Sequence, residues 1–75
     1  MTLDELRLGQ RAVVRTLTTR GPQRCRLLDL GLVPGVEVVA ELASPLGDPT
    51  AYRVLGTTSV LRRAQAREIE VVRGE

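Results

Sequence analysis

Several residue types are missing from this chain of 75 residues, and each absence narrows what it can do. It contains no histidine, phenylalanine or tryptophan, and its only aromatic residue is Tyr52. All eleven basic residues are arginine, so lysine is absent as well. Without an imidazole or an amine, the chain lacks the bases that usually activate a nucleophile. We therefore expect that it is not an enzyme and that it has no catalytic residues.

Cysteine is almost absent too. Cys25 alone can form neither an intrachain disulfide nor a thiolate metal cage, which favours a reducing compartment. No N-terminal stretch combines basic residues with an apolar run, and no segment approaches the roughly 20 apolar residues of a membrane span. These features predict a cytoplasmic protein that is peripheral to a membrane only through a partner.

Metal ligands are sparse as well. Iron sites favour imidazole and carboxylate groups that converge from several directions. Glu37 and Glu41 are four residues apart on a predicted strand, about 13 Å along it, which is too far to chelate one ion. Asp48 lies in a loop, where we expect its carboxylate to accept backbone hydrogen bonds. We expect no metal ligands and no cofactor within one chain.

The remaining residues alternate between short extended segments and turn signals over a length that suits one domain, residues 1–75. Strands are expected where apolar residues recur at every second position. Ala12 and Val14 share one face, and Val38, Ala40 and Leu42 share another. The expected strands cover residues 10–17, 36–42, 50–55, 58–61 and 68–72.

Short strands on so small a chain favour a closed or nearly closed barrel, because closure removes exposed sheet edges. The predicted fold class is therefore all-β. It is a small SH3-like barrel of about five short antiparallel strands, with one short helix between the first two strands. Leu3 and Leu6, in a capped turn at the N-terminus, are expected to plug one end of the core.

The helix is predicted from Pro22, which suits a first helical position, to Leu30. Gly31 is expected to end it in the left-handed conformation, with Leu32 packing back. Helical steps of about 100° place Leu27 and Leu30 on one arc of the helix. The nearly opposite arc holds the other apolar residues, Cys25, Leu28 and Leu32.

One small barrel cannot bury both arcs of this helix fully. Either a loop such as residues 44–49 covers the arc of Leu27 and Leu30, or this arc stays open to a partner. An apolar centre with a polar rim is typical of protein interfaces, and Arg24 and Arg26 flank the arc. Our hypothesis is that the partner-binding residues are Arg24, Arg26, Leu27 and Leu30.

Four segments in order resemble the FeoA family, and together they cover nearly the whole chain. They are residues 6–14, residues 26–35 (RLLDLGLVPG), residues 44–49 (SPLGDP) and residues 59–66 (SVLRRAQA) followed by Ile69 and Val71. The resemblance implies an SH3-like accessory protein of bacterial ferrous iron transport. It also implies a partner, ferrous iron transport protein B, which carries a cytosolic GTP-binding domain. The family is described as associated with transition metal ions, although this chain offers no imidazole.

Two other functions stay open. The same module occurs as the C-terminal domain of metal-dependent repressors, and a metal-binding regulatory domain could share its site between subunits. Because the sequence starts at Met1 with no helix-turn-helix segment before it, we expect the transport accessory instead. The other alternative is a nucleic-acid-binding barrel that uses Arg20, Arg24, Arg26 and the pair Arg62 and Arg63.

We expect no nucleic-acid partner, for two reasons. Single-strand binding uses aromatic stacking platforms, and Tyr52 stands alone. The net charge of +2 is too small to indicate such a partner by itself. The oligomeric state is left open by the sequence.

Overall fold

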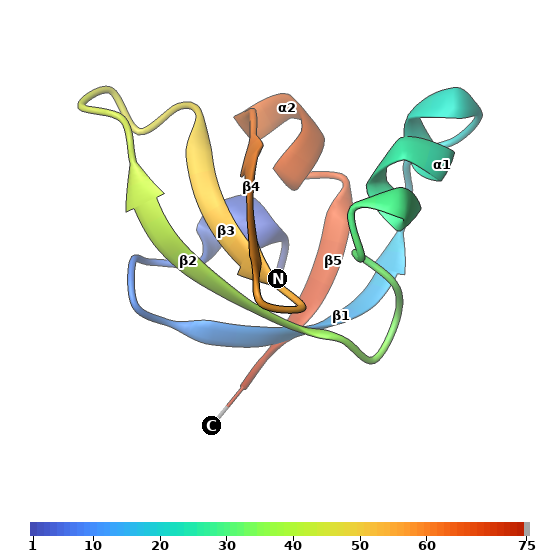
Figure 1. Ribbon diagram of the computed structural model, residues 1–75, viewed down its shortest axis with the longest axis horizontal. Coiled ribbons are helices and arrows are strands. Elements are labelled where there is room, and N and C mark those ends of the chain that lie inside the picture. The colour runs from blue at the N-terminus through green and yellow to red at the C-terminus, as the bar shows by residue number, and fades with distance from the viewer. Residues whose placement is uncertain (75) are drawn as a thin grey trace.

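Five antiparallel strands form one strongly curved sheet in the computed structural model, which describes residues 1–74 (Figure 1). They lie in the order β4-β3-β2-β1-β5, so that β1 and β2 are central and β4 and β5 are the edges. The strands are β1 (Arg11–Leu17), β2 (Glu37–Ala43), β3 (Thr50–Val54), β4 (Thr57–Leu61) and β5 (Ile69–Arg73).

Three short helical segments complete the fold. They are η1 (Leu3–Glu5), α1 (Pro22–Asp29) and α2 (Arg63–Ala66). Figure 1 shows α1 beside the end of β1, and α2 between β4 and β5 at the mouth of the curved sheet. The predicted SH3-like barrel with a helix between its first two strands is confirmed. Each predicted strand end lies within one residue of the observed end.

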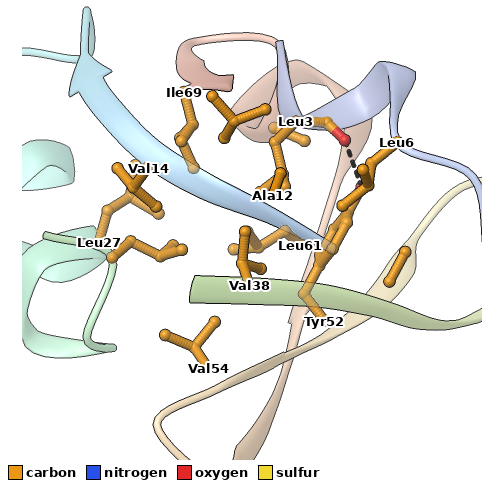
Figure 2. Packing of buried hydrophobic residues seen from close by; sticks show 14 of the residues in the cluster. Leu3, Leu6, Ala12, Val14, Leu27, Val38, Tyr52, Val54, Leu61 and Ile69 are labelled. Carbon is orange, nitrogen blue, oxygen red and sulfur yellow. Dashed lines mark hydrogen bonds between the residues drawn. The ribbon is translucent and has the colours of Figure 1, made fainter. Parts of the chain in front are cut away.

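The core is aliphatic except for Tyr52 (Figure 2). Leu3 and Leu6 plug one end of it, as predicted, and are 0% and 6% exposed. The Tyr52 hydroxyl donates a hydrogen bond to the Leu3 carbonyl oxygen at 3.4 Å, so the one polar atom of this ring is satisfied. The other buried apolar residues are Ala12, Val14, Leu17, Leu27, Leu32, Val38, Ala40, Val54, Leu61, Ala66, Ile69 and Val71.

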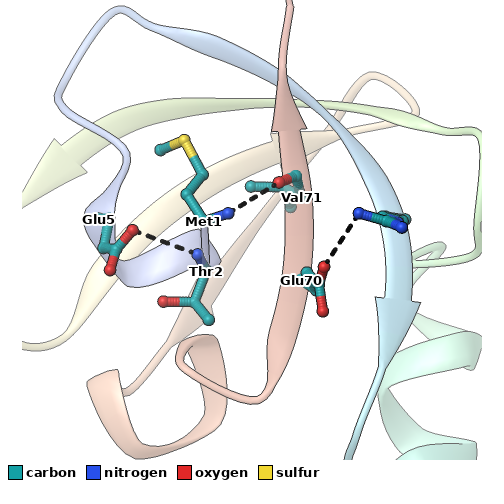
Figure 3. A network of polar contacts seen from close by, with 6 residues as sticks. Met1, Thr2, Glu5, Glu70 and Val71 are labelled. Atoms are coloured by element: carbon teal, nitrogen blue, oxygen red, sulfur yellow. Dashed lines mark hydrogen bonds and ion pairs between the residues drawn. The ribbon is translucent and has the colours of Figure 1, made fainter.

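The N-terminal residues are fastened to β5 (Figure 3). Thr2 and Glu70 form an isolated antiparallel bridge. The Val71 N–H donates to the Met1 carbonyl oxygen at 2.8 Å, and the Met1 amino group donates to the Val71 carbonyl oxygen at 3.5 Å. The Glu5 carboxylate reaches back to the Thr2 N–H at 3.4 Å, as expected for the predicted capped turn. These contacts cover part of the β5 edge.

Strand β2 departs from its predicted alternation near its end. Its pairing with β3 shifts between Ala40 and Leu42, which places a bulge at Glu41. Ala40 stays buried opposite Tyr52, but Leu42 pairs with Ala51 and is 68% exposed. The prediction that Leu42 faces the core is therefore wrong, because an extra residue in one strand reverses the faces that follow it.

The loop of residues 44–49 is fixed by its own hydrogen bonds. The Ser44 hydroxyl donates to the Asp48 carbonyl oxygen at 2.7 Å and accepts from the Asp48 N–H at 3.1 Å. The Asp48 carboxylate accepts the Arg63 N–H at 2.9 Å, which is a backbone bond as predicted, but from α2 rather than from its own turn. Figure 1 places this loop on the opposite side of the barrel from α1, so it does not cover the helix.

Burial of Tyr52 raises the pKa of its phenol above the ordinary value. A raised folded-state pKa means that the folded protein holds this proton more tightly than the unfolded chain does. The contribution of the protonated phenol to the free energy of unfolding is fully present below the unfolded-state pKa of about 10. It is lost as the pH rises from there through the higher pKa of the folded protein. We expect the free energy of unfolding, measured by urea denaturation, to drop as the pH rises above about 10.

The chain is well suited to this measurement because it contains neither a lysine nor a second tyrosine. Tyr52 is therefore its only side chain with an ordinary pKa near 10. Phenolate absorbance gives the pKa of the folded protein directly, and Tyr52→Phe should flatten the alkaline decline. An alkaline decline that is equally steep in Tyr52→Phe would contradict the assignment.

Candidate partner-binding surface

Helix α1 ends in a Schellman motif, which decides the face that the helix presents to the barrel. Gly31 has a φ of +96°. Its N–H donates to the Leu28 carbonyl oxygen at 3.0 Å, and the Leu32 N–H donates to the Leu27 carbonyl oxygen at 3.1 Å. In this motif the residue after the glycine packs against the residue five positions before it. Leu32 therefore folds back towards Leu27.

Both of these leucines lie in the core, because Leu27 is 1% exposed and Leu32 is 0% exposed. The hypothesis that Leu27 lies on an open arc is therefore wrong. The hypothesis continued the helical steps through Gly31 and so placed Leu32 on the arc opposite Leu27. Gly31 is in the left-handed conformation, however, and turns the chain back towards the helix. Leu27 and Leu32 form one buried contact, and the barrel-facing side of the helix is centred on Leu27.

The other three residues of the hypothesis do not share one surface. Leu30 and Arg24 lie about 60° to either side of Leu27 on the helix, and both are half-buried. The Arg24 Nη1 atom donates to the Leu17 carbonyl oxygen at 2.9 Å, so this arginine fastens α1 to the end of β1. Arg26 is exposed on the same side as Leu30. The accessible part of the predicted site is thus Arg26 with the outer half of Leu30.

A hollow that the sequence analysis missed begins where α1 ends. At the tip of the β3–β4 hairpin, Leu55 has a φ of +52° and is 70% exposed. A Cβ atom on Gly31 would lie only 2.8 Å from the Leu55 Cδ1 atom, so the leucine side chain covers the end of the helix. The hollow has a volume of about 440 Å³ and is lined by Gly35, Val36, Glu37, Val39, Arg53, Leu55 and Gly56.

A sequence signal for this hollow was present. Two-residue hairpin turns in which both residues have positive φ favour Asn, Asp or Gly. A branched apolar residue at the first of these positions, as in Leu55-Gly56, is unusual. It indicates that the side chain has a contact that holds it there, and the contact is with the end of α1.

The rim of the hollow carries paired charges. The Glu41 carboxylate accepts a hydrogen bond from the Thr58 hydroxyl at 2.6 Å and from Arg53 Nε at 3.0 Å. These two hydrogen bonds lower the pKa of Glu41 below its ordinary value, and the bond from Thr58 has the larger effect. Arg53 is therefore held in place on the rim, while Glu37 is exposed beside it.

A second hollow lies at the start of α1. It measures about 520 Å³ and is lined by Leu17, Thr18, Thr19, Arg20, Gly21 and Arg24. Thr19 is 3% exposed, and its hydroxyl donates to the Glu68 Oε1 atom at 3.2 Å. Because Thr19 and Arg24 are both engaged within the protein, Arg20 is the arginine of this hollow that extends freely into solvent.

Two further properties bear on function. Within residues 1–74, no three His, Cys, Asp or Glu side chains are grouped closely enough to hold a metal ion. No helix in this part of the chain has the length and apolar character needed to cross a bilayer. Cys25 is exposed on the solvent side of α1.

The fold and these surfaces define a class of protein: an SH3-like barrel with a helix docked beside it and shallow contact surfaces at both ends of that helix. Comparison with known proteins gives the family. A family model described as the FeoA domain matches residues 1–73, and the chain belongs to this family.

Relatives and solved structures agree with this assignment. An Fe(2+) transport protein A/Fe(2+) transporter FeoB fusion protein from Porphyromonas gingivalis is 39% identical over 71 residues, which cover 95% of this chain and 8% of the fusion protein. The solution structure of FeoA from Chlorobium tepidum is 38% identical, with a TM-score of 0.91 over 97% of this chain and 70% of that one.

A crystal structure is also similar. It is that of Stenotrophomonas maltophilia FeoA complexed with zinc, which is described as a procaryotic SH3 domain protein. It is 35% identical and has a TM-score of 0.84 over 95% of this chain and 88% of that one.

Proposed function

We propose that this chain is a cytoplasmic accessory module of bacterial ferrous iron transport, and that it binds the cytosolic GTP-binding part of the iron transporter. One observation carries the proposal: the fusion protein from Porphyromonas gingivalis joins a segment similar to this chain to the transporter FeoB. Two proteins joined in one chain are held beside each other at a high effective concentration, which suits partners that associate. The module acts by binding rather than by catalysis, and the ferrous ion is the cargo of the transporter.

The proposed contact surface combines the outer half of Leu30 with the hollow beneath Leu55. Its apolar part includes Leu55, which is 70% exposed, and the half-buried Val36. Arg26 and Glu37 stand exposed at its edge. An apolar centre with a charged rim is how protein interfaces are built. Because Leu55 rests on Gly31, the helix and the hairpin present one continuous surface.

Binding at this surface can influence the transporter in only one way. A partner shifts a conformational equilibrium by the difference between its affinities for the two states. The module would therefore alter nucleotide turnover or gating only if it binds one nucleotide state of the transporter more tightly than another. This makes the dependence of affinity on GTP the central quantity to measure.

The test is a calorimetric titration of this protein against the cytosolic GTP-binding domain of the transporter, with and without GTP. We expect Leu55→Glu and Leu30→Glu each to weaken binding at least tenfold, or about 1.4 kcal/mol, because each places a charge in the apolar centre. Leu46→Glu is the matched control, since Leu46 is 90% exposed in the loop of residues 44–49, which lies on the opposite side of the barrel from α1 (Figure 1).

The outcomes separate the surface from the function. If folded Leu55→Glu and Leu30→Glu proteins bind as tightly as the wild type, the surface is wrong. If the wild-type protein binds the domain in neither nucleotide state, the proposed function itself is overturned.

A further inference from the structure

Three large apolar side chains are exposed at the end of the sheet that lies away from α1. Leu46, in the loop between β2 and β3, is 90% exposed, Leu42 is 68% exposed and Val60 is 62% exposed. Leu42 pairs with Ala51, and Ala51 pairs with Val60, so both side chains lie on the outer face of the sheet. We call Leu42, Leu46 and Val60 the apolar tip.

The loop that carries Leu46 is held rigidly. Besides the bonds of Ser44 and Asp48 described above, the Thr50 hydroxyl donates to the Gly47 carbonyl oxygen at 3.2 Å. The Gly47 N–H donates to the Ser44 carbonyl oxygen at 2.8 Å. A leucine on a loop that is already ordered can bind without the entropic cost of ordering the loop. Figure 1 shows this loop projecting from the barrel.

Arginines flank the apolar tip. Arg62 and Arg63 follow β4 directly, and both are exposed. A Cβ atom on Gly47 would lie 3.4 Å from the Arg63 Nη2 atom, so this guanidinium lies against the loop.

Acidic groups near the apolar tip are already engaged. Asp48 is the only acid in residues 42–49 and 60–67, and its carboxylate accepts the Arg63 N–H. Asp4 and Glu5 of η1, which contacts α2, accept hydrogen bonds from the Thr2 hydroxyl and the Thr2 N–H. Glu41, next to Leu42, is paired with Arg53. The apolar tip is thus a protruding apolar group in a positively charged setting.

We propose that the apolar tip and its flanking arginines dock onto an anionic lipid bilayer. The charges are complementary, because arginines near a bilayer surface are attracted by anionic headgroups while apolar side chains enter the boundary of the acyl chains. The shape points the same way. A protruding leucine enters a deformable interface directly, whereas a protein partner would need a groove matched to it.

Leu46 and its loop lie on the opposite side of the barrel from α1 (Figure 1). Leu42 and Val60 lie closer to the other proposed surface, because their row of the sheet is one step along the outer face from Arg53, which lines the hollow. Binding through a few side chains is weak by itself. It gains strength when a membrane-bound partner raises the effective concentration of the module at the bilayer.

The test is a set of amide NMR spectra of the whole protein with nanodiscs of phosphatidylcholine, alone or mixed with phosphatidylglycerol. With the anionic discs we expect signals of residues 44–49 and 60–63 to broaden, and added salt to reverse part of the effect. We expect Arg62→Gln/Arg63→Gln and Leu46→Ser each to weaken the apparent affinity by about tenfold.

Matched controls remove the same groups elsewhere. Arg20→Gln/Arg73→Gln removes two charges beside α1 and at the end of β5, and Val72→Ser removes an exposed apolar side chain of β5. Both should bind the anionic discs like the wild type. The spectra also report whether each variant is folded.

Three results would overturn the inference: no broadening with anionic discs, equal broadening with uncharged discs, or unchanged affinity in both variants of the apolar tip. If Leu46→Ser instead weakens binding to the transporter domain while the discs have no effect, the apolar tip binds a protein and the bilayer inference fails. Because the discs contain no transporter, this result is independent of the test of the proposed function.

Discussion

Replacing Leu27 with alanine is expected to lower the free energy of unfolding by about 3 kcal/mol, because the cavity that is left adds to the lost burial. Leu27 is 1% exposed and packs in the core. A domain of this size has a total stability of roughly 4–11 kcal/mol, so the loss is a large fraction of it. Guanidinium denaturation followed by far-ultraviolet circular dichroism measures the change without needing a tryptophan.

The control is Leu46→Ala, which removes the same atoms from a side chain that is 90% exposed. We expect this change to stay within about 0.5 kcal/mol of the wild type. If Leu27→Ala lowered the free energy of unfolding as little as the control does, the burial of Leu27 would be contradicted. The hypothesis that Leu27 lies on an open arc would then be supported. A charge at this position, as in Leu27→Glu, should prevent folding and cannot serve as a binding test.

Replacing Gly31 with alanine should cost about 2 kcal/mol or more of stability, for two reasons that add. The φ of +96° is one that side chains with a Cβ atom rarely adopt. The new Cβ atom would also lie 2.8 Å from the Leu55 Cδ1 atom and 3.3 Å from the Val54 Cγ1 atom. Chemical denaturation gives the total, and the end of α1 should lose hydrogen-exchange protection first.

Two comparisons separate these reasons. Gly56 has a φ of +77°, and no heavy atom of the described residues, apart from its two chain neighbours, lies within 4 Å of its Cβ position, so Gly56→Ala measures the conformational part alone. In the double variant Gly31→Ala/Leu55→Ala, the cost of the alanine at 31 should shrink because its neighbour is shortened. Equal costs for Gly31→Ala and Gly56→Ala would show that the contact with Leu55 carries no energy.

Local patterns were sufficient to predict most of the fold. The alternation of Val38 and Ala40, and of Ile69 and Val71, marks strands that are half-buried, and the structure places all four side chains in the core. Pro22 and Gly31 mark the ends of the helix because each suits a backbone conformation found at that end. The bulge in β2 could not be predicted in this way. It depends on how β2 pairs with β3, which a local pattern of alternating residues does not describe.

Only the accessibility of the predicted site can be compared with the structure. Arg26 and the outer half of Leu30 are accessible, as the helical projection predicted, whereas Leu27 is buried. That Arg26 and Leu30 bind a partner stays a prediction. A helical projection cannot follow the chain through the left-handed residue that ends the helix. The contribution of Leu55 depends on a contact between the hairpin and the helix, which lie far apart in the sequence. Such contacts are set by tertiary packing, and they decide which apolar residues remain accessible.

Cys25 gives the protein a built-in position for a reporter. It is the only thiol in the chain, and it is exposed on α1, five residues before Leu30 and about 140° around the helix from it. A fluorescent dye attached there needs no engineered substitution and stands away from the core. Its emission would respond to a transporter domain that settles on the helix and would stay constant when the opposite end of the barrel meets a bilayer. One labelled sample could therefore tell the two encounters apart in real time.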